Sequence, residues 1–294
     1  KYRHMNNKKP KAKLSFKKKP NSKSLNFKSK QKAFIDPSEV SYDLDKNLDH
    51  FLGEHLATES VAKIESKFHE LEFRMGKFRG NRFDAYMPRL QFNRIIQHYH
   101  QKYSDNLVEN ISLDIIYDEN YRVTISGQTL NNSKNEIEYF CKTNRMRDDQ
   151  VDYYEKVQVA KSDNKDWSYR LTSAHESEIK NQTERMKIKN GVEDKTASKF
   201  YRYKYRYSFQ INDQVRLDCT IVKETPPGVR AGTLIKSRTL AQKEKYQIEM
   251  EYTGQNFKKD NLAKLLLIPL NELSSLYMGI KGSKRSISQS HTDL

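Results

Sequence analysis

Residues 201–209, Tyr-Arg-Tyr-Lys-Tyr-Arg-Tyr-Ser-Phe, constrain the fold more than any other segment. The odd positions are all aromatic, and the even positions are Arg202, Lys204, Arg206 and Ser208. A β-strand sends alternate side chains to opposite faces of its sheet. The segment therefore predicts a strand with one aromatic face and one hydrophilic, mainly cationic face.

Three other segments show the same alternation with acidic residues. Their charged or polar positions are Glu70, Glu72 and Arg74 in the first, Arg216, Asp218 and Thr220 in the second, and Gln247, Glu249 and Glu251 in the third. Each strand alone is typical of a sheet whose charged face meets solvent. Taken together, the ordered acidic pairs and the apolar opposite faces favour a barrel with a charged interior and helices packed outside.

Strand patterns with turn residues between them recur along the chain. We predict strands at 70–75, 113–117, 121–126, 136–143, 153–161, 167–178, 200–210, 214–223, 234–240 and 245–252, with a turn at 131–133. Helical spacing predicts one or two short helices within 38–67, a helix from about Pro88 and another over 261–276. In the helix from Pro88, the expected buried stripe is Leu90, Phe92, Ile95, Ile96 and Tyr99. The expected fold is α+β, with an eight-stranded antiparallel β-barrel.

The net charge of +16 is unevenly placed, because residues 1–35 hold 13 of the 54 Lys and Arg residues and none of the 38 acidic ones. We expect a disordered basic arm over 1–36, a barrel domain over 37–280 and a polar tail over 281–294. The arm either solubilises the chain or captures nucleic acid by counterion release. We expect no membrane span and no secretory signal, and two reduced cysteines in an intracellular protein.

Four carboxylates brought together in a barrel interior repel one another and raise one another's pKa values unless a cation lies among them. Hard oxygen ligands favour Mg²⁺ or Mn²⁺ over zinc. The Lys and Arg side chains of the facing wall then need an anion, and a polyphosphate satisfies both walls. The residues therefore predict phosphoryl chemistry.

The segments Glu70-Leu-Glu-Phe-Arg-Met-Gly-Lys-Phe78 and Gln247-Ile-Glu-Met-Glu251 carry a family resemblance. Over residues 64–252 the chain resembles the metal-dependent RNA 5′-triphosphatases of the triphosphate tunnel metalloenzyme superfamily, found in fungi, protists and large DNA viruses. The resemblance implies an eight-stranded tunnel that removes the γ-phosphate of nascent triphosphate RNA, the first step of mRNA capping. It also implies an mRNA guanylyltransferase, in trans or as a missing downstream module. The implied location is the nucleus, or a viral factory or virion.

The resemblance also implies roles for individual residues. The metal ligands are Glu70, Glu72 and Glu251, while Glu249 and Asp218 hold waters of the metal. The substrate-binding cations are Lys156, Lys204, Arg206, Arg216, Arg122 and Arg170, and Thr220 supports Asp218 together with Arg216. Glu176 orients the attacking water, with Glu178 as the rival for that role.

Two positions depart from the family pattern, and other functions remain open. Gln247 replaces a third acidic residue, and Lys156 replaces an arginine. Arg74 stands where relatives acting on nucleotides or inorganic polyphosphate have lysine, a difference that favours RNA. The alternatives are such a tunnel enzyme, a non-catalytic scaffold like a Mediator head subunit, and a basic RNA-binding protein whose charged faces meet solvent. Only the first of these alternatives shares the predicted metal site.

Overall fold

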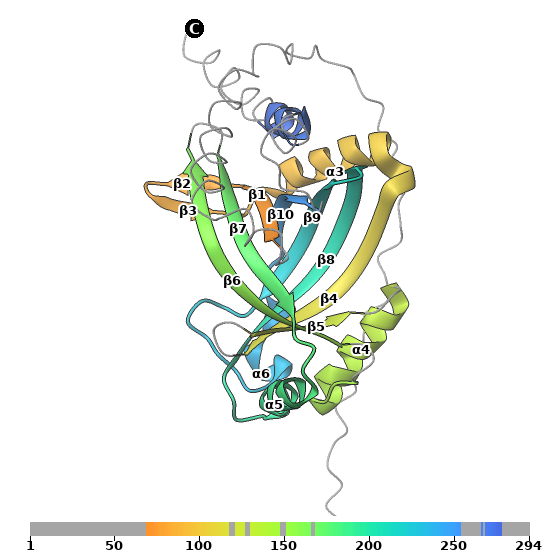
Figure 1. Ribbon diagram of the computed structural model, residues 1–294, viewed down its shortest axis with the longest axis vertical. Helices are drawn as coiled ribbons and strands as arrows, with labels where there is room; N and C mark the ends of the chain where they lie inside the picture. Colours follow the sequence, from red (N-terminus) through yellow and green to blue (C-terminus); the bar gives the residue numbers. More distant parts are fainter. Residues whose placement is uncertain are drawn as a thin grey trace, which may run out of the picture. The chain divides into compact units, whose positions relative to one another are not determined.

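Eight antiparallel strands close into a barrel in this computed structural model (Figure 1). Neighbouring strands follow the order β1-β10-β9-β8-β4-β5-β6-β7, and β7 pairs with β1 to complete the closure. The strands are β1 His69–Met75, β4 Leu107–Tyr117, β5 Tyr121–Ser126, β6 Val151–Asn164, β7 Tyr169–Glu178, β8 Lys199–Asn212, β9 Val215–Glu224 and β10 Lys245–Tyr252. The predicted eight-stranded barrel is confirmed.

The structure describes residues 69–117, 121–126, 130–147, 151–165, 168–253, 266 and 268–277. The expected basic arm (1–36), the helices within 38–67 and the polar tail (281–294) lie outside these residues. Of the predicted C-terminal helix, residues 268–277 are described and are helical. Among the helices in the described ranges, none is both long and apolar enough to cross a bilayer.

The apolar faces of the strands point outward and are covered by helices, as predicted. Helix α3 (Arg89–Tyr103) buries Phe92, Ile95 and Tyr99 against the outer faces of β8 and β10. Leu90, expected in the same stripe, is exposed instead. On β8, the aromatic face predicted from the alternation places Phe209 in this core and Tyr201 in a second core.

The second core lies under helices α4 (Leu130–Thr143) and α5 (Gln182–Glu193). Ile137 and Phe140 of α4 and Ile188 of α5 pack there with the outer faces of β4 and β5. Figure 1 shows α4 and α5 towards one end of β4 and β8, with α3 at the other end. Because helices cover the apolar faces, the charged faces of the same strands are directed into the barrel.

The strand predicted at 136–143 is wrong, since these residues form the second half of α4. The buried positions, Ser133, Glu136, Ile137 and Phe140, recur at intervals of three and four, which is the spacing of a helix face. The polar residues 131–133 begin the helix and do not form the expected turn. The alternation of polar and apolar residues within 136–143 is too short to distinguish a strand from the buried face of a helix.

The strand predicted at 234–240 is also wrong. Residues Leu234–Ser237 form the short helix α6, and Thr239–Ala241 form a 3₁₀ turn. The Thr233 side chain accepts a hydrogen bond from the backbone N–H of Lys236, which caps the N-terminus of α6. Arg238, with φ of 55°, ends the helix in the left-handed region.

Helix α5 and a short hairpin were also missed in the sequence analysis. The cap of α5 is formed by the Asn181 side chain accepting from the N–H of Glu184, a recognisable Asn-x-x-Glu signal. The hairpin consists of β2 (Lys77–Arg79) and β3 (Arg82–Asp84), with Gly80 at φ 62° in its turn. Both elements are short and polar, so neither gives a strong apolar period.

The helical packing of α4 predicts that Phe140→Ala destabilises the protein by about 3–5 kcal/mol, because it leaves a cavity under the helix. Glu138→Ala changes an exposed position of the same helix and should cost under about 0.5 kcal/mol. Urea unfolding of both variants measures the difference. Similar losses for the two variants would contradict the helical packing.

Candidate active site

The two glutamate pairs come from neighbouring strands and meet in the barrel interior. In the pairing of β1 with β10, Glu72 lies opposite Glu251, and Arg74 lies opposite Glu249. Glu72 is 5% exposed and Glu249 is 8% exposed. Residues far apart in the sequence therefore share one patch of the interior wall, because the last strand of the barrel returns beside the first.

Basic side chains contact each of these glutamates. The Arg74 guanidinium bridges Glu72, at 2.5 Å, and Glu249, at 2.7 Å. Lys156 of β6 donates a hydrogen bond to Glu70, and Arg216 of β9 reaches Glu251 at 2.5 Å. Ion pairs thus connect these four glutamates, which we call the acidic patch, to basic residues of β1, β6 and β9. Such pairing is expected for ionised groups that are removed from water.

Burial and mutual repulsion shift the pKa values of these carboxyls. Burial and the neighbouring Glu249 raise the pKa of Glu72, while Arg74 and other cations outweigh burial and lower the pKa of Glu249. Burial, Glu70 and Asp218 raise the pKa of Glu251 to about 7 against the opposing effect of Arg216. Arg74, Lys156 and Arg216 therefore do not fully compensate the negative charge of the acidic patch.

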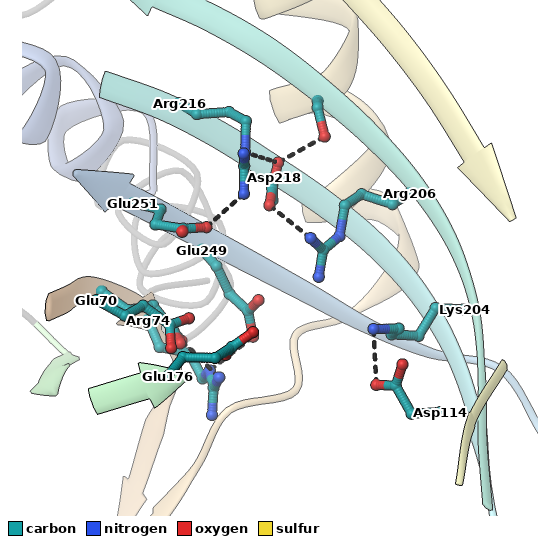
Figure 2. A network of polar contacts seen from close by, with 12 residues as sticks. Glu70, Arg74, Asp114, Glu176, Lys204, Arg206, Arg216, Asp218, Glu249 and Glu251 are labelled. Atoms are coloured by element: carbon teal, nitrogen blue, oxygen red, sulfur yellow. Dashed lines mark hydrogen bonds and ion pairs between the residues drawn. The ribbon is translucent and has the colours of Figure 1, made fainter. Parts of the chain in front are cut away.

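Asp218 of β9 is the hub of a second charge network. It lies between Arg206, at 3.0 Å, and Arg216, also at 3.0 Å, and accepts a 2.7 Å hydrogen bond from Ser208 (Figure 2). Because Arg216 also contacts Glu251, the network joins Asp218 to the acidic patch. The hydrophilic side chains predicted for β8 therefore lie beside the charged side chains of β9 and contact them.

Glu176 and Glu178 of β7 have different surroundings. Glu176 contacts Arg122 of β5 and lies 3.7 Å from Lys156, inside the barrel. The Glu178 side chain is 49% exposed and bonds to Arg185 of helix α5. Of these two glutamates, Glu176 contacts cations inside the barrel and Glu178 contacts a cation of helix α5.

Arg170 and Thr220 complete the residues singled out from the sequence. Arg170 is held by Asp163 through two hydrogen bonds of 2.6 and 2.9 Å, at the β6–β7 hairpin. Thr220 is buried on β9, and its hydroxyl makes no hydrogen bond. Most of the expected residues therefore lie inside the barrel, whereas Glu178 is bound to Arg185 and Arg170 is bound to Asp163 at the hairpin.

Sequence reasoning missed two interior acids, Asp114 and Glu224, and the contacts of Arg74. Asp114 of β4 is 1% exposed and pairs with Lys204 at 2.7 Å. Arg74 was noted on the glutamate face, but its bridging of two glutamates was not foreseen. Glu224, at the end of β9, contacts Lys245 and accepts a hydrogen bond from Tyr86. A lone Asp within Leu-Asp-Ile-Ile was a usable signal for Asp114, because an aspartate in an apolar strand needs a buried partner.

The chemistry of the acidic patch suits a hard divalent cation. Its donors are carboxylate oxygens, the ligands that Mg²⁺ and Mn²⁺ prefer. Glu72 Oε1 is buried without a well-oriented hydrogen bond, although Arg74 pairs with it, so this oxygen is a donor that a cation would satisfy. Within the described ranges, no three His, Cys, Asp or Glu residues already converge as a metal-ligand group.

The raised pKa of Glu251 predicts a pH dependence of stability. The folded chain holds this proton up to about pH 7, whereas the ordinary pKa is 4.5, so folding stability falls as pH rises through that window. Glu251→Gln mimics the protonated form. In chelator, its melting temperature should fall less between about pH 5 and pH 8 than that of the unaltered chain.

Glu155→Gln is the matched control, because Glu155 is exposed on the outer face of β6. It should keep the slope of the unaltered chain. Equal slopes for Glu251→Gln and the unaltered chain would contradict the assignment of this proton to Glu251.

Comparison with known proteins finds no matching protein-family model and no matching curated protein. Solved structures do match. The RNA triphosphatase domain of the mimivirus mRNA capping enzyme is similar with a TM-score of 0.49 and 20% identity, over 73% of this chain and 95% of that chain. A triclinic structure of the mimivirus capping enzyme triphosphatase gives a TM-score of 0.48 and 19% identity, over 80% and 98% of the two chains.

A fungal protein is also similar. The S. pombe RNA triphosphatase Pct1 matches with a TM-score of 0.45 and 14% identity, over 85% of this chain and 96% of that chain. These structures are RNA triphosphatases, the enzymes that the glutamate motifs of the sequence resemble.

Proposed function

We propose that this protein is a metal-dependent RNA 5′-triphosphatase, which hydrolyses the γ-phosphate of triphosphate RNA and leaves a diphosphate end. The observation that carries the proposal is the placement of four glutamates on β1 and β10, in a barrel whose other strands direct Lys and Arg inward. An acidic patch suited to a divalent cation beside a basic wall suited to phosphate is the arrangement that phosphoryl transfer needs.

The acidic patch is the proposed metal site. Glu70, Glu72 and Glu251 are the proposed direct ligands, and Glu249 holds water beside them. When bound, Mg²⁺ or Mn²⁺ would neutralise phosphate oxygens and polarise the phosphorus towards attack. An ion held by these carboxylates would take over the charge compensation that Arg74, Lys156 and Arg216 now provide, and these three residues would then be available to phosphate oxygens.

The basic residues neutralise charge on the triphosphate. Lys156, Lys204 and Arg206 are the proposed contacts for the reacting phosphate, with Arg122 and Arg216 beside them. Cations fixed before the reaction stabilise the transition state without reorganising, which is the main source of catalysis in phosphoryl transfer. Arg170 is left out, because its guanidinium is held by Asp163.

Glu176 is the proposed residue that orients the attacking water. It is the acid of β7 that reaches the interior cations Arg122 and Lys156, whereas Glu178 is bound to Arg185. Asp218 is already paired with two arginines and Ser208, so its proposed role is to fix Arg206 and Arg216 and to hold water. No covalent intermediate with the protein is required.

RNA is the proposed polyanion because of the charge of the chain. Residues 1–35 hold 13 Lys and Arg residues without an acidic residue, and such a segment attracts a nucleic-acid backbone by counterion release. A nucleoside triphosphate or inorganic polyphosphate presents the same phosphates without this backbone. A diphosphate RNA end is the substrate of guanylyl transfer, so we expect an mRNA guanylyltransferase as a partner or on the same polypeptide.

Removal of a proposed metal ligand should abolish catalysis. Glu70→Ala and Glu251→Ala should each lower Mg²⁺- or Mn²⁺-dependent phosphate release from triphosphate RNA by about a hundredfold or more, because the charge-stabilising ion is lost. Glu155→Ala, on the outer face of β6, should keep full activity. Unchanged turnover in either interior variant would discard the proposed site.

Substrate choice separates RNA from the other triphosphates. At equal concentration and low salt, phosphate release from triphosphate RNA should exceed release from ATP and tripolyphosphate, and the RNA preference should shrink as salt rises. A preference for ATP or tripolyphosphate would assign the chain to another triphosphatase activity. Calorimetric titration with Mn²⁺ that shows no binding would favour a non-catalytic scaffold.

A further inference from the structure

Asp114 is a buried acid on the basic side of the barrel interior. Strand β4 lies between β8 and β5, and Asp114 is opposite Arg202 on one side and Thr124 on the other. Its carboxylate receives the Lys204 ammonium at 2.7 Å and a hydrogen bond of 3.1 Å from the Thr124 hydroxyl. Figure 2 shows this pair set apart from the glutamates, with Lys204 aimed at Asp114.

The surrounding charges make Asp114 a firm anchor for Lys204. Although burial opposes ionisation, Lys204, Arg122 and Arg202 lower the pKa of Asp114 to about 2. For Lys204 the balance is different, because burial and three nearby arginines outweigh Asp114 and lower its pKa to about 8. At neutral pH both groups are charged, and the carboxylate is the ionised partner that compensates Lys204.

Lys204 has a second possible set of partners across the interior. Arg202, the inward residue before Lys204 on β8, donates a 3.0 Å hydrogen bond to Gln247 of β10, and Glu249 is the next inward residue of β10. Inward side chains of β8 therefore reach as far as β10. A lysine carries its charge on a flexible stem with freely rotating donors. A buried ammonium is unfavourable without a counterion. Without Asp114, the incompletely compensated glutamates of the acidic patch would offer Lys204 another one.

We propose that Asp114 is a positioning residue, which holds Lys204 against β4 and so keeps its ammonium from occupying the acidic patch. The inference rests on the proposed function, since it assigns the patch to a divalent cation. Asp114 thereby keeps the Lys204 ammonium from pairing with the carboxylates of the acidic patch. Lys204 stays available to bind phosphate, and the glutamates stay available to bind the ion.

The test is a double-mutant cycle read by Mn²⁺ binding alone, without substrate. Asp114→Asn keeps the shape of the side chain and removes its charge, and Lys204→Met keeps the length of the stem and removes the ammonium. The cycle compares the unaltered chain, both single variants and the double variant by titration calorimetry at neutral pH. Thermal melting of each variant in chelator checks that it is folded, and the double variant leaves no unpaired buried charge.

Asp114→Asn should weaken Mn²⁺ binding about tenfold, which is within the range of coupling between contacting charged groups. Lys204→Met should bind at least as tightly as the unaltered chain. Adding Lys204→Met to Asp114→Asn should restore Mn²⁺ affinity, because no ammonium is left to compete. Triphosphatase turnover should stay low in both Lys204→Met variants, since the phosphate contact is missing.

The possible outcomes are distinct. Mn²⁺ affinity that is unchanged in Asp114→Asn, or that remains weak in the double variant, overturns the positioning role while leaving the metal site in place. A general structural role for Asp114 predicts the second of these results. An unaltered chain that binds no Mn²⁺ removes the proposed function, and this inference with it.

Discussion

The structure depends on pairing opposite charges inside a closed barrel. Strand after strand directs ionisable side chains inward, and an ion taken from water is stable only when an opposite charge and hydrogen bonds replace its hydration. Arg74 pairs with Glu72 of its own strand and with Glu249 of β10, and Arg216 pairs with Asp218 of its own strand and with Glu251 of β10. Each of these two arginines thus joins two neighbouring strands, which couples the register of the barrel to its charge pattern.

The apolar faces determine which way the charges point. The inner faces of the strands form little apolar core, so hydrophobic stabilisation comes from the outside, where α3, α4 and α5 cover the aromatic faces. Tyr201 and Phe209, at the two ends of the alternating segment, are fully buried by different clusters. The helices thus hold the charged faces inward, and the fold inverts the usual arrangement of polar surface and apolar centre.

The charges inside are segregated, and this segregation supports the functional proposal. Acids concentrate on β1 and β10, whereas cations concentrate on β8 and on positions of β5, β6 and β9. Burial and repulsion raise the pKa values of Glu72 and Glu251, so a divalent ion in place of the proton would stabilise the acidic side. An anion would stabilise the basic side. The proposed metal-bound phosphate chain would supply both charges.

The sequence by itself determined the faces of the strands. Alternation is a local property of an extended chain, so the parity of Tyr201 to Phe209 and of the glutamate pairs predicted which side chains would share a wall. The same reasoning failed for 136–143 and 234–240, where a short alternating stretch belonged to a helix that packing and capping selected. Only the tertiary structure decided that β10 closes beside β1, that Lys204 is anchored by Asp114, and that Glu176 contacts the interior cations while Glu178 does not. These are contacts between strands separated by tens to hundreds of residues, and their partners are set by barrel closure and register, which no local pattern encodes.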